Sequence, residues 1–298
     1  MNVVIPNFNG VNLLRENLPT AFAALEFANI AYRIIVVDDC STDDSVSFLR
    51  NRYPEILIIK LEQNVGFSQA CNRGLEYCVY NLTCIVNTDA AFDREYFTKS
   101  IKYFVRPDLF AVKGEIQNFK DSIDKIINIE QTSKVYYSRG FLRFNQKIEP
   151  EPERLTAKLN EQFVLLGCCF VCDTEKMKLL KGYDVRYSPY YWEDADLAFR
   201  AIEMGYRLVY ASECKVQHNL SSTISHTQSN TKRRVISIRN KFQFTWRHMP
   251  GRKYWINHSI VVVVSIFIRW LKLDWKYYYC LFLALKQTWL YRDSRVAK

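Results

Sequence analysis

Short apolar runs separated by helical patterns mark the first part of the chain. The runs Val3–Pro6, Arg33–Val37, Ile56–Ile59 and Thr83–Val86 each have the length of a strand, and between them apolar positions recur at helical spacing. The second run shows no polar alternation, which is typical of a strand buried on both faces. This alternation predicts an α/β fold with a doubly wound, mostly parallel sheet.

Polar residues directly follow three of these strands. They are Asn7–Asn9, Asp38–Asp39 and Asn87–Asp89. Ligands of such sheets bind beyond the carboxyl ends of the strands, so these side chains are expected to converge on one crevice. The chain has neither a Gly-x-Gly-x-x-Gly motif after a strand nor a Gly-x-x-x-x-Gly-Lys-Ser/Thr motif, which argues against a dinucleotide enzyme or a P-loop phosphotransferase. A bound nucleotide would therefore need a metal at its phosphates, with Asp89 as an oxygen ligand.

The middle of the chain shows weaker patterns. The predicted elements are an amphipathic helix carried by Ile123, Ile126, Ile127 and Gln131, a buried strand over Phe163–Val171, and a strand over Arg207–Ala211. The substrate specificity of the protein is expected to depend on the shape of a pocket formed between about Phe97 and Lys158.

Three carboxylates, Glu193, Asp194 and Asp196, stand between an aromatic run and an apolar helical pattern. They are expected in the first turn of a helix, where free N–H groups and the macrodipole favour negative charge, and capping alone would explain them. Trp192 and the two tyrosines before it would form an apolar wall that raises a carboxylate pKa towards that of a general base. Successive helix positions diverge by about 100°, so the three acids cannot share one direction, and Asp196 is expected to pair with Arg200.

Cysteine and histidine spacing raises a competing hypothesis. Cys169-x-x-Cys172 and Cys214-x-x-x-His218 have zinc-like spacing. Residues three apart in a strand point to opposite faces, so Cys169 and Cys172 could share a metal only across a sharp bend. Buried cysteine is also common as a small hydrophobe. His218 stays a candidate metal ligand, since it ends a strand on the crevice side with Asp89.

Composition changes near residue 230. Residues 232–298 hold 15 Lys and Arg against two acids, a net charge of +13, whereas the first 231 residues hold 26 against 29, a net charge of −3. The tail also contains five of the six tryptophans. These differences predict a catalytic domain over 1–230 and a basic, aromatic helical tail over 231–298.

Two apolar runs in the tail indicate contact with a membrane. Ile260–Ile268 and Tyr277–Leu285 are shorter than the ~20 residues that span a bilayer. Flanked by Trp, Tyr, Lys and Arg, they favour helices that lie in the cytoplasmic interface. The alternative is a helical pair packed on the catalytic domain or on a second copy of the chain, as in a homo-oligomer.

The N-terminal residues predict where the chain is located. Met1–Pro6 lead straight into an apolar strand and lack the features of a secretory signal. We therefore expect a cytoplasmic protein, peripheral on the inner face of the plasma membrane, with its nine cysteines reduced.

Several of these stretches together resemble family 2 glycosyltransferases over about residues 2–225. The matching stretches, in the order and spacing of the family, are Val4–Gly10, Val36–Asp43, Asn64–Phe67, Asn87–Asp89, Gly167–Phe170, Trp192–Leu197 and His218. The branch that looks most similar builds bacterial cell-surface polysaccharide and is often called rhamnosyltransferase-like.

The resemblance implies an A-type glycosyltransferase fold, inversion at the anomeric carbon and a divalent cation, Mg²⁺ or Mn²⁺. Residues 1–95 would form the nucleotide-binding half and residues 96–230 the acceptor half. The implied partners are a nucleotide-diphosphate sugar, UDP- or dTDP-linked, and a glycan acceptor. If the tail binds membrane, that acceptor would be lipid-linked.

The resemblance also assigns roles to individual residues. Asp194 would be the base, with Glu193 orienting the acceptor or a neighbouring group, and Asp89 and His218 would bind the metal. The implied substrate-binding residues are Pro6, Asn7, Asn9, Asp38, Asp39, Asn64, Gly66, Asn72, Asn87, Gly167 and Trp192. Asn87 replaces the first acid of the family's Asp-x-Asp motif, and an amide is a weaker ligand for a hard cation than a carboxylate.

Two other functions fit parts of the pattern. A nucleotidyltransferase would share the sheet and the metal, but it normally carries a Gly-rich basic loop after the first strand, where Pro6–Asn9 stand here. A nucleic-acid-binding protein would explain the basic aromatic tail. The run Ile260–Val264 has no place on a phosphate-binding face, so we do not expect nucleic acid as a partner.

Overall fold

The computed structural model describes residues 1–118, 127–129, 132–147, 162–163, 166–218 and 229–291. Its strands are β1 (Asn2–Asn7), β2 (Arg33–Asp38), β3 (Leu57–Lys60), β4 (Leu82–Val86), β5 (Ala90–Phe92), β6 (Leu109–Asn118), β7 (Ile127–Ile129), β8 (Thr132–Ser138), β9 (Phe141–Lys147), β10 (Gln162–Phe163), β11 (Cys169–Asp173) and β12 (Arg207–His218). Its α-helices are α1 (Val11–Phe27), α2 (Ser45–Arg52), α3 (Phe67–Leu75), α4 (Tyr96–Ile101), α5 (Thr174–Leu179), α6 (Glu193–Glu203), α8 (Asn230–His248), α9 (Arg252–Leu271) and α10 (Trp275–Leu290).

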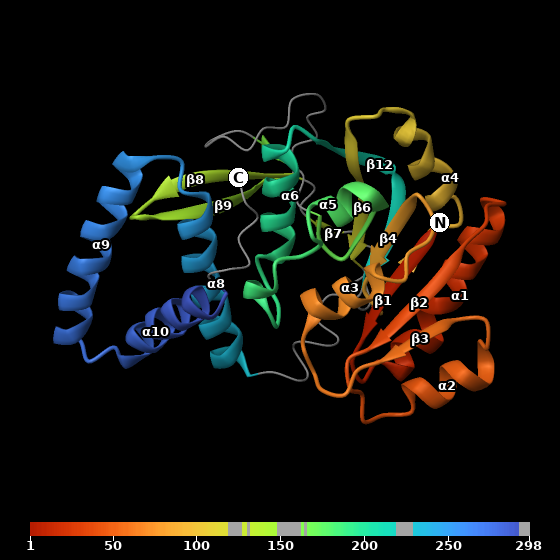
Figure 1. Cartoon of the computed structure of the whole chain (residues 1–298), viewed down its shortest axis with the longest axis horizontal. Helices are drawn as coiled ribbons and strands as arrows, with labels where there is room; N and C mark the ends of the chain where they lie inside the picture. Colours follow the sequence, from red (N-terminus) through yellow and green to blue (C-terminus); the bar gives the residue numbers. More distant parts are fainter. Residues whose placement is uncertain (119–126, 130–131, 148–161, 164–165, 219–228, 292–298) are drawn as a thin grey trace.

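The main sheet confirms the predicted doubly wound α/β fold (Figure 1). Its order is β3-β2-β1-β4-β11-β6-β12-β5, with β7 paired to β6. The first four strands are parallel, as the alternating pattern predicts, and β12 runs parallel to β6. Antiparallel β11 and β5 are inserted in the second half.

Two apolar clusters cover the two faces of this sheet. On β1, Val3 and Ile5 belong to one cluster and Val4 to the other, because successive strand residues point to opposite faces. Helices α1, α2 and α4 pack on the first face, and α3, α5 and α6 on the second. The two cysteines of the Cys-x-x-Cys motif, Cys169 and Cys172, also fall into different clusters, as predicted for a strand.

Two predicted elements in the middle of the chain are wrong. Ile127 lies in strand β7 rather than in a helix, because Ile127–Ile129 pair with β6; residues 123, 126 and 131 of the predicted helix lie outside the described ranges. The strand expected over Phe163–Val171 is interrupted by a turn at Gly167, whose φ is +71°. A left-handed residue cannot continue a strand, and glycine adopts that conformation at little cost.

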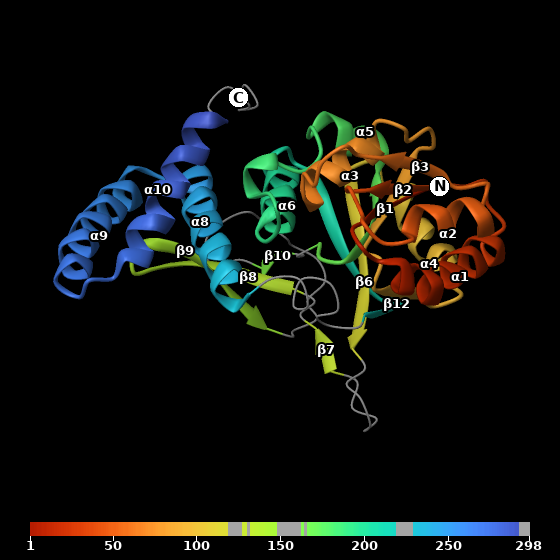
Figure 2. The ribbon, with the colours of Figure 1, turned by 90° about the horizontal axis from the view of Figure 1, so that it is seen from below.

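The C-terminal helices stand at one side of the molecule, with α6 between them and the sheet (Figures 1 and 2). Helix α8 starts at residue 230, where composition changes. The β8–β9 hairpin, paired antiparallel, reaches towards α8 and α9.

Helix α9 is longer than its apolar run suggests. Among the described residues it is the one helix that length and composition would allow to cross a membrane, with 20 residues and a mean hydropathy of 1.4 over an 18-residue window. The nine-residue run Ile260–Ile268 therefore lies within a helix whose full length of 20 residues reaches the ~20 residues that span a bilayer.

Candidate active site

The ends of β1 and β2 are joined by hydrogen bonds through the polar residues that follow them. The Asp38 carboxylate is fully buried and accepts from Asn7 Nδ2 at 3.0 Å and from the Ser41 backbone N–H at 3.1 Å. Asn9 Oδ1 accepts from the Thr42 backbone N–H at 2.7 Å. The predicted residues Asn7, Asn9 and Asp38 therefore lie together at one edge of the sheet.

The Asp39 carboxylate shapes the next loop. Its two oxygens accept from the backbone N–H groups of Val65 at 2.7 Å and Gly66 at 2.8 Å. Asn64 Nδ2 donates to the backbone carbonyl of Asp39 at 3.3 Å. Burial raises the pKa of Asp39, and these two N–H bonds oppose the rise. Gly66 has a φ of +85°, and a Cβ there would meet Pro189 Cα at 2.7 Å, so only glycine fits.

Two predicted substrate-binding residues make contacts with the protein itself. Asn72 Nδ2 donates to the Tyr183 carbonyl and Asn72 Oδ1 accepts from the Tyr183 N–H, both at 2.8 Å. Asn72 thus ties α3 to the loop before α6. Pro6 is partly buried within β1, in register with Val37 of β2.

The predicted metal ligands Asp89 and His218 lie next to each other. The antiparallel pairing of β12 with β5 sets His218 opposite Ala90, and His218 Nε2 is 3.1 Å from Asp89 Oδ1. The side chains of His218 and Asp89 are 13% and 11% exposed. In the described part of the chain, His218 Nδ1 and Asn87 Oδ1 are buried without a hydrogen-bond partner.

These donor atoms fit a divalent cation whose remaining ligands come from a bound substrate. Carboxylate, imidazole and amide oxygen are ligands that Mn²⁺ and Mg²⁺ accept. Within the described ranges, no group of three or more His, Cys, Asp and Glu side chains could hold a metal. A cation at Asp89 and His218 would therefore need oxygens of a bound diphosphate to complete its coordination.

Lys113 of β6 brings a positive charge to the same edge. It is 2% exposed, and its Nζ lies 3.8 Å from the position that a Cβ on Gly167 would occupy. Burial raises the pKa of the Cys168 thiol, as do the charges of Asp89 and Asp194, whereas Lys113 lowers it. The charges of Asp89 and Asp194 therefore both act on Cys168, which follows directly on Gly167.

The acids at the start of α6 occupy its first turn, as predicted. Burial raises the pKa of Asp194 to about 7, against the lowering effect of Lys113. Burial, followed by the charge of Asp194, raises the pKa of Glu193 well above its usual value. Glu193 Oε2 and Asp194 Oδ1 are buried and have no hydrogen-bond partner among the described residues. Such oxygens could accept a proton or a hydrogen bond from a substrate.

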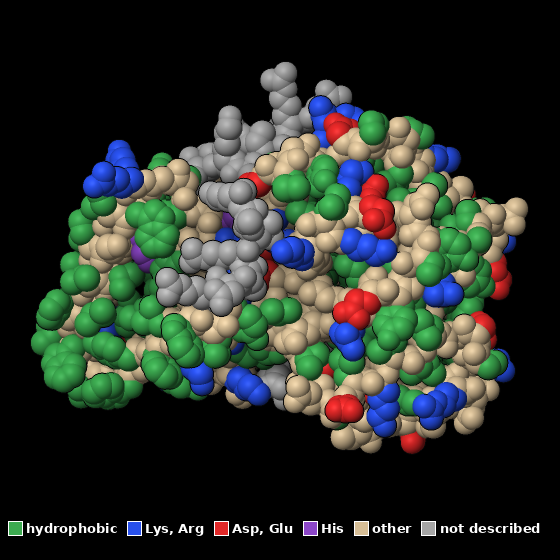
Figure 3. All heavy atoms as spheres, in the orientation of Figure 1, with side chains coloured by type: hydrophobic (Ala, Val, Ile, Leu, Met, Phe, Trp, Pro, Cys, Tyr) green, Lys and Arg blue, Asp and Glu red, His purple; other side chains and the backbone are tan. Residues whose placement is uncertain are grey.

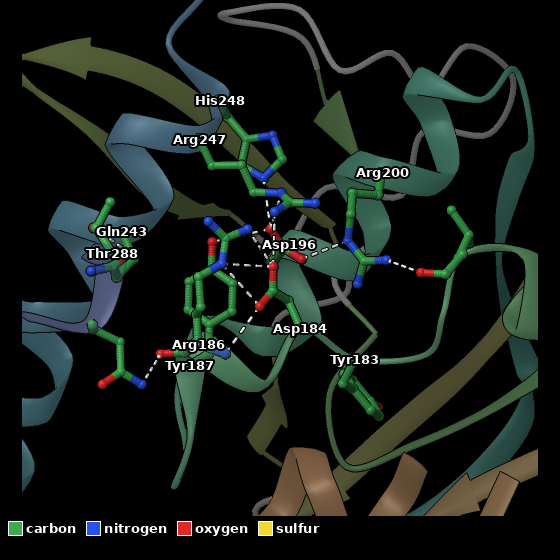
Figure 4. Close-up of polar contacts among 12 residues, drawn as sticks. Tyr183, Asp184, Arg186, Tyr187, Asp196, Arg200, Gln243, Arg247, His248 and Thr288 are labelled. Carbon is green, nitrogen blue, oxygen red and sulfur yellow. Dashed lines mark hydrogen bonds and ion pairs between the residues drawn. The ribbon is translucent and has the colours of Figure 1, made fainter. Parts of the chain in front are cut away.

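Asp196 has a separate role, and its predicted pairing with Arg200 is confirmed. Its fully buried carboxylate accepts from Arg200 Nε at 2.7 Å and Tyr187 OH at 3.0 Å, and it lies 2.9 Å from His248 Nε2 and 3.1 Å from Arg247 Nε (Figure 4). Burial alone would raise the pKa of Asp196, but Arg200 and His248 lower it to about 2. Asp196 therefore holds α6 to α8.

Trp192 also contacts α8. Its ring centroid lies 4.7 Å from that of Phe144 on β9 and 5.3 Å from that of Phe244 on α8. Its Nε1 donates to Ser237 Oγ at 3.5 Å. The residue before α6 is therefore packed into an aromatic cluster shared with the C-terminal region.

The region with these strand-end residues matches a known family. The model of glycosyl transferase family 2 matches residues 2–175, which is more than half of the chain. The chain belongs to this family. The amylovoran biosynthesis glycosyltransferase AmsE of Erwinia amylovora is 33% identical over 92 residues, 30% of this chain and 35% of AmsE. The match thus spans about a third of that relative.

Solved structures share the fold of this family 2 member. TarS residues 1–349 of S. aureus, in complex with UDP, has 16% identity and a TM-score of 0.55, covering 74% of this chain and 60% of that one. The mannosyltransferase PcManGT from Pyrobaculum calidifontis, in complex with GDP-Man and Mn²⁺, has 15% identity and a TM-score of 0.56, covering 99% and 76%. At these identities the likeness shows the fold alone.

Sequence reasoning missed several residues of this site. The sequence could have indicated Lys113, because a lysine that directly follows the apolar run Leu109–Val112 is unusual in a buried strand. Arg247, His248 and Asn240 of α8 offered none, since their partners lie about fifty residues earlier in the chain.

Proposed function

We propose that the chain is an inverting glycosyltransferase that moves a sugar from a nucleoside-diphosphate donor to a hydroxyl of a glycan acceptor. The observation that carries this proposal is Asp194, a partly buried residue whose carboxyl has a pKa of about 7 and whose charge, like that of Asp89, acts on Cys168. A group with this pKa is matched to general-base catalysis near neutral pH. One base that removes the acceptor proton, opposite the leaving diphosphate, gives displacement with inversion.

The other residues of the site bind and orient. A divalent cation, held by Asp89 and His218, would supply charge stabilisation to the departing diphosphate. Asp38 and the loop shaped by Asp39 would contact the nucleoside. Lys113 keeps part of the Asp194 population ionised, because its charge lowers a pKa that burial raises.

The relatives guide the choice of substrates. TarS is solved with UDP and with UDP-GlcNAc, PcManGT with GDP-Man and Mn²⁺, and AmsE is named for amylovoran biosynthesis. We propose a UDP- or dTDP-sugar as donor, Mg²⁺ or Mn²⁺ as cation, and a role in bacterial cell-surface polysaccharide synthesis.

Donor binding should depend on the cation through Asp89. A thermal-shift panel of UDP-, dTDP- and GDP-sugars should show stabilisation by one nucleotide class, larger with Mn²⁺ than without, because a ligand that binds only the folded state raises Tm. Asp89→Ala should remove most of the Mn²⁺-dependent shift, and His218→Ala part of it.

The exposed Asp93, a few residues beyond Asp89 along the chain, provides a matched control. Asp93→Ala should keep the full nucleotide shift. Undiminished donor affinity of Asp89→Ala at saturating Mn²⁺ would remove Asp89 from the metal site. No stabilisation of the wild-type chain by any nucleotide sugar would count against the proposed function itself.

Exposed apolar side chains gather on helices α9 and α10 (Figure 3). Sixteen of the 22 exposed large apolar side chains lie between Trp255 and Leu290, including Phe267 at 67% and Trp289 at 74% exposure. An apolar patch of this extent marks an interaction site. Lys and Arg residues, such as Arg269, lie among these side chains.

The contacts of α9 favour an interfacial position over a membrane span. Tyr137 OH donates to Asn257 Oδ1 at 2.9 Å, and His258 Nδ1 is 2.5 Å from the Gly140 carbonyl. These contacts join α9 to the β8–β9 hairpin. If α9 crossed a bilayer, these contacts would break and α9 would separate from the rest of the protein. We propose that α9 and α10 lie on the inner face of the plasma membrane, where a lipid-linked acceptor is within reach.

The protein should therefore co-sediment with vesicles that contain anionic phospholipid and leave them at high salt, because basic side chains supply part of the attraction. Phe267→Glu combined with Phe282→Glu should abolish sedimentation, since both side chains are at least 60% exposed on this surface. Val105→Glu, at an exposed apolar position of the catalytic body, is the matched control.

Truncation before α8 would be a poor test, because Arg247 and His248 are bound to Asp196. If the wild-type chain ignores the vesicles but forms a dimer that the double variant dissociates, this surface is an interface between copies. If it does neither, the proposal is wrong.

A further inference from the structure

The side chain of Asn240 on α8 is fully buried against the loop that leads into α6. Its Nδ2 donates to the carbonyl oxygens of Tyr187 at 2.7 Å, Tyr190 at 3.0 Å and Tyr191 at 2.8 Å. Its Oδ1 accepts from Arg239 Nε at 2.8 Å, which fixes the orientation of the amide. One amide group thus gathers three backbone carbonyls of a single loop.

The loop needs such support because two of its residues are strained. Tyr191 and Trp192 have φ values of 75° and 77°, in the left-handed region that non-glycine residues rarely occupy. Such conformations persist only where the surrounding structure determines them. Glu193 and Asp194 follow directly. The backbone conformation of Tyr191 and Trp192 therefore sets the direction in which both carboxylates point.

We propose that Asn240 is a positioning residue for Asp194: by binding the carbonyls before the catalytic helix, it fixes the carboxylate against the acceptor. The inference rests on the proposed function, in which Asp194 is the base. It also means that the C-terminal region does more than attach the protein to a surface, since α8 supplies part of the support of the catalytic site.

The test compares two buried amides on the same helix. Gln243, one turn after Asn240 and 3% exposed, donates to the Ala284 carbonyl of α10 and accepts from Thr288 Oγ1 at 3.1 Å. Asn240→Ala and Gln243→Ala should both lower Tm, because each removes the hydrogen bonds of a buried amide side chain. Only Asn240→Ala should lower kcat, by about 10²-fold, with donor affinity unchanged, since small displacements of a reacting group carry that cost.

A pH titration separates positioning from general loss of stability. In Asn240→Ala the loop can relax and admit water, so the pKa of Asp194 should fall by about one unit towards its usual value, and the acid limb of kcat should move to lower pH. The ¹³C shift of the Asp194 carboxyl reports the same pKa without turnover, so it remains valid if the proposed reaction is wrong. Gln243→Ala should leave the pKa of Asp194 unchanged.

Asn240→Gln keeps the N–H donors on a longer side chain and replaces the alanine variant if that variant fails to fold. It should lower the pKa of Asp194 by less than Asn240→Ala does. An Asp194 titration unchanged in both Asn240 variants, or changed equally in Gln243→Ala, would overturn the inference.

Discussion

Replacing Asp194 by Asn is expected to lower kcat by about 10²–10⁴-fold while donor and metal binding stay normal. The amide has nearly the shape of the carboxyl but cannot take the acceptor proton. The loss should appear in kcat rather than in donor affinity, because the residues proposed to contact the nucleotide lie on β1, β2 and the loop at Gly66. Turnover and donor affinity, measured on the same preparation, check this.

The pH dependence gives a second signature. The base works only when ionised, so wild-type kcat should rise as pH increases through about 7, the folded-state pKa of Asp194. Because this pKa lies above the usual value of 3.8, burial of Asp194 costs stability that appears between about pH 4 and pH 7. Asp194→Asn removes that cost and should raise Tm at pH 8 but not at pH 4.

Glu193→Gln is the matched control for that prediction. It removes the neighbouring acid from the same turn, and it should retain more turnover than Asp194→Asn. Near-normal turnover in Asp194→Asn, with Glu193→Gln inactive but still able to bind donor, would move the base to Glu193.

The nucleotide-binding half could be predicted because its pattern is local. The run Ile34–Val37 is apolar without interruption, and a strand buried on both faces is the structure that satisfies it. Phe163–Val171 has an equally apolar pattern, but the left-handed turn at Gly167 interrupts it. Ile127 lies in a strand because β7 pairs with Ile116–Asn118. The helical spacing of apolar residues gives no information about such a contact.

The acids of the site could be predicted, whereas their support could not. The position of Glu193 and Asp194 follows from the helix pattern, and the i,i+4 pairing of Asp196 with Arg200 follows from helix geometry. The contacts of Asn240 and His248 join residues about fifty positions apart. Charge and tryptophan content predicted a helical tail over 231–298, and α8 within that region carries side chains that contact α6 and the loop before it.

The second large effect should come from Asp196, whose replacement by Asn is expected to lower the free energy of unfolding by about 3–5 kcal/mol. The amide would leave Arg200 and His248 at a buried site without the charge of Asp196, and Arg247 would keep only Asp184, at 2.8 Å, as a close acidic partner. Breaking a buried ionic network by removing one partner costs far more than losing an exposed ion pair. Against a total stability of about 5–15 kcal/mol, this is a large part of what keeps the protein folded. Urea unfolding of both proteins measures it.

The pH at which the difference is largest follows from the two pKa shifts. The pKa of Asp196 is lowered to about 2, so its contribution is complete above its usual value of 3.8 and is lost as pH falls towards 2. Burial alone would lower the pKa of His248, but the hydrogen bonds and charges of Asp196 and Glu203 together outweigh burial, and the pKa is raised. The contribution of protonated His248 is thus complete below its usual 6.5 and is lost as pH rises through the folded value.

The destabilisation by Asp196→Asn should therefore be largest between about pH 4 and pH 6.5, where both groups are charged in the folded protein. Glu175→Gln, which removes an acid that is 75% exposed and paired with Lys178 at 3.2 Å, should change stability little at any pH. A variant Asp196→Asn that keeps wild-type stability but loses transfer would show that Asp196 acts in the reaction. A loss of stability that is independent of pH would mean that packing, rather than charge, holds α6 to α8.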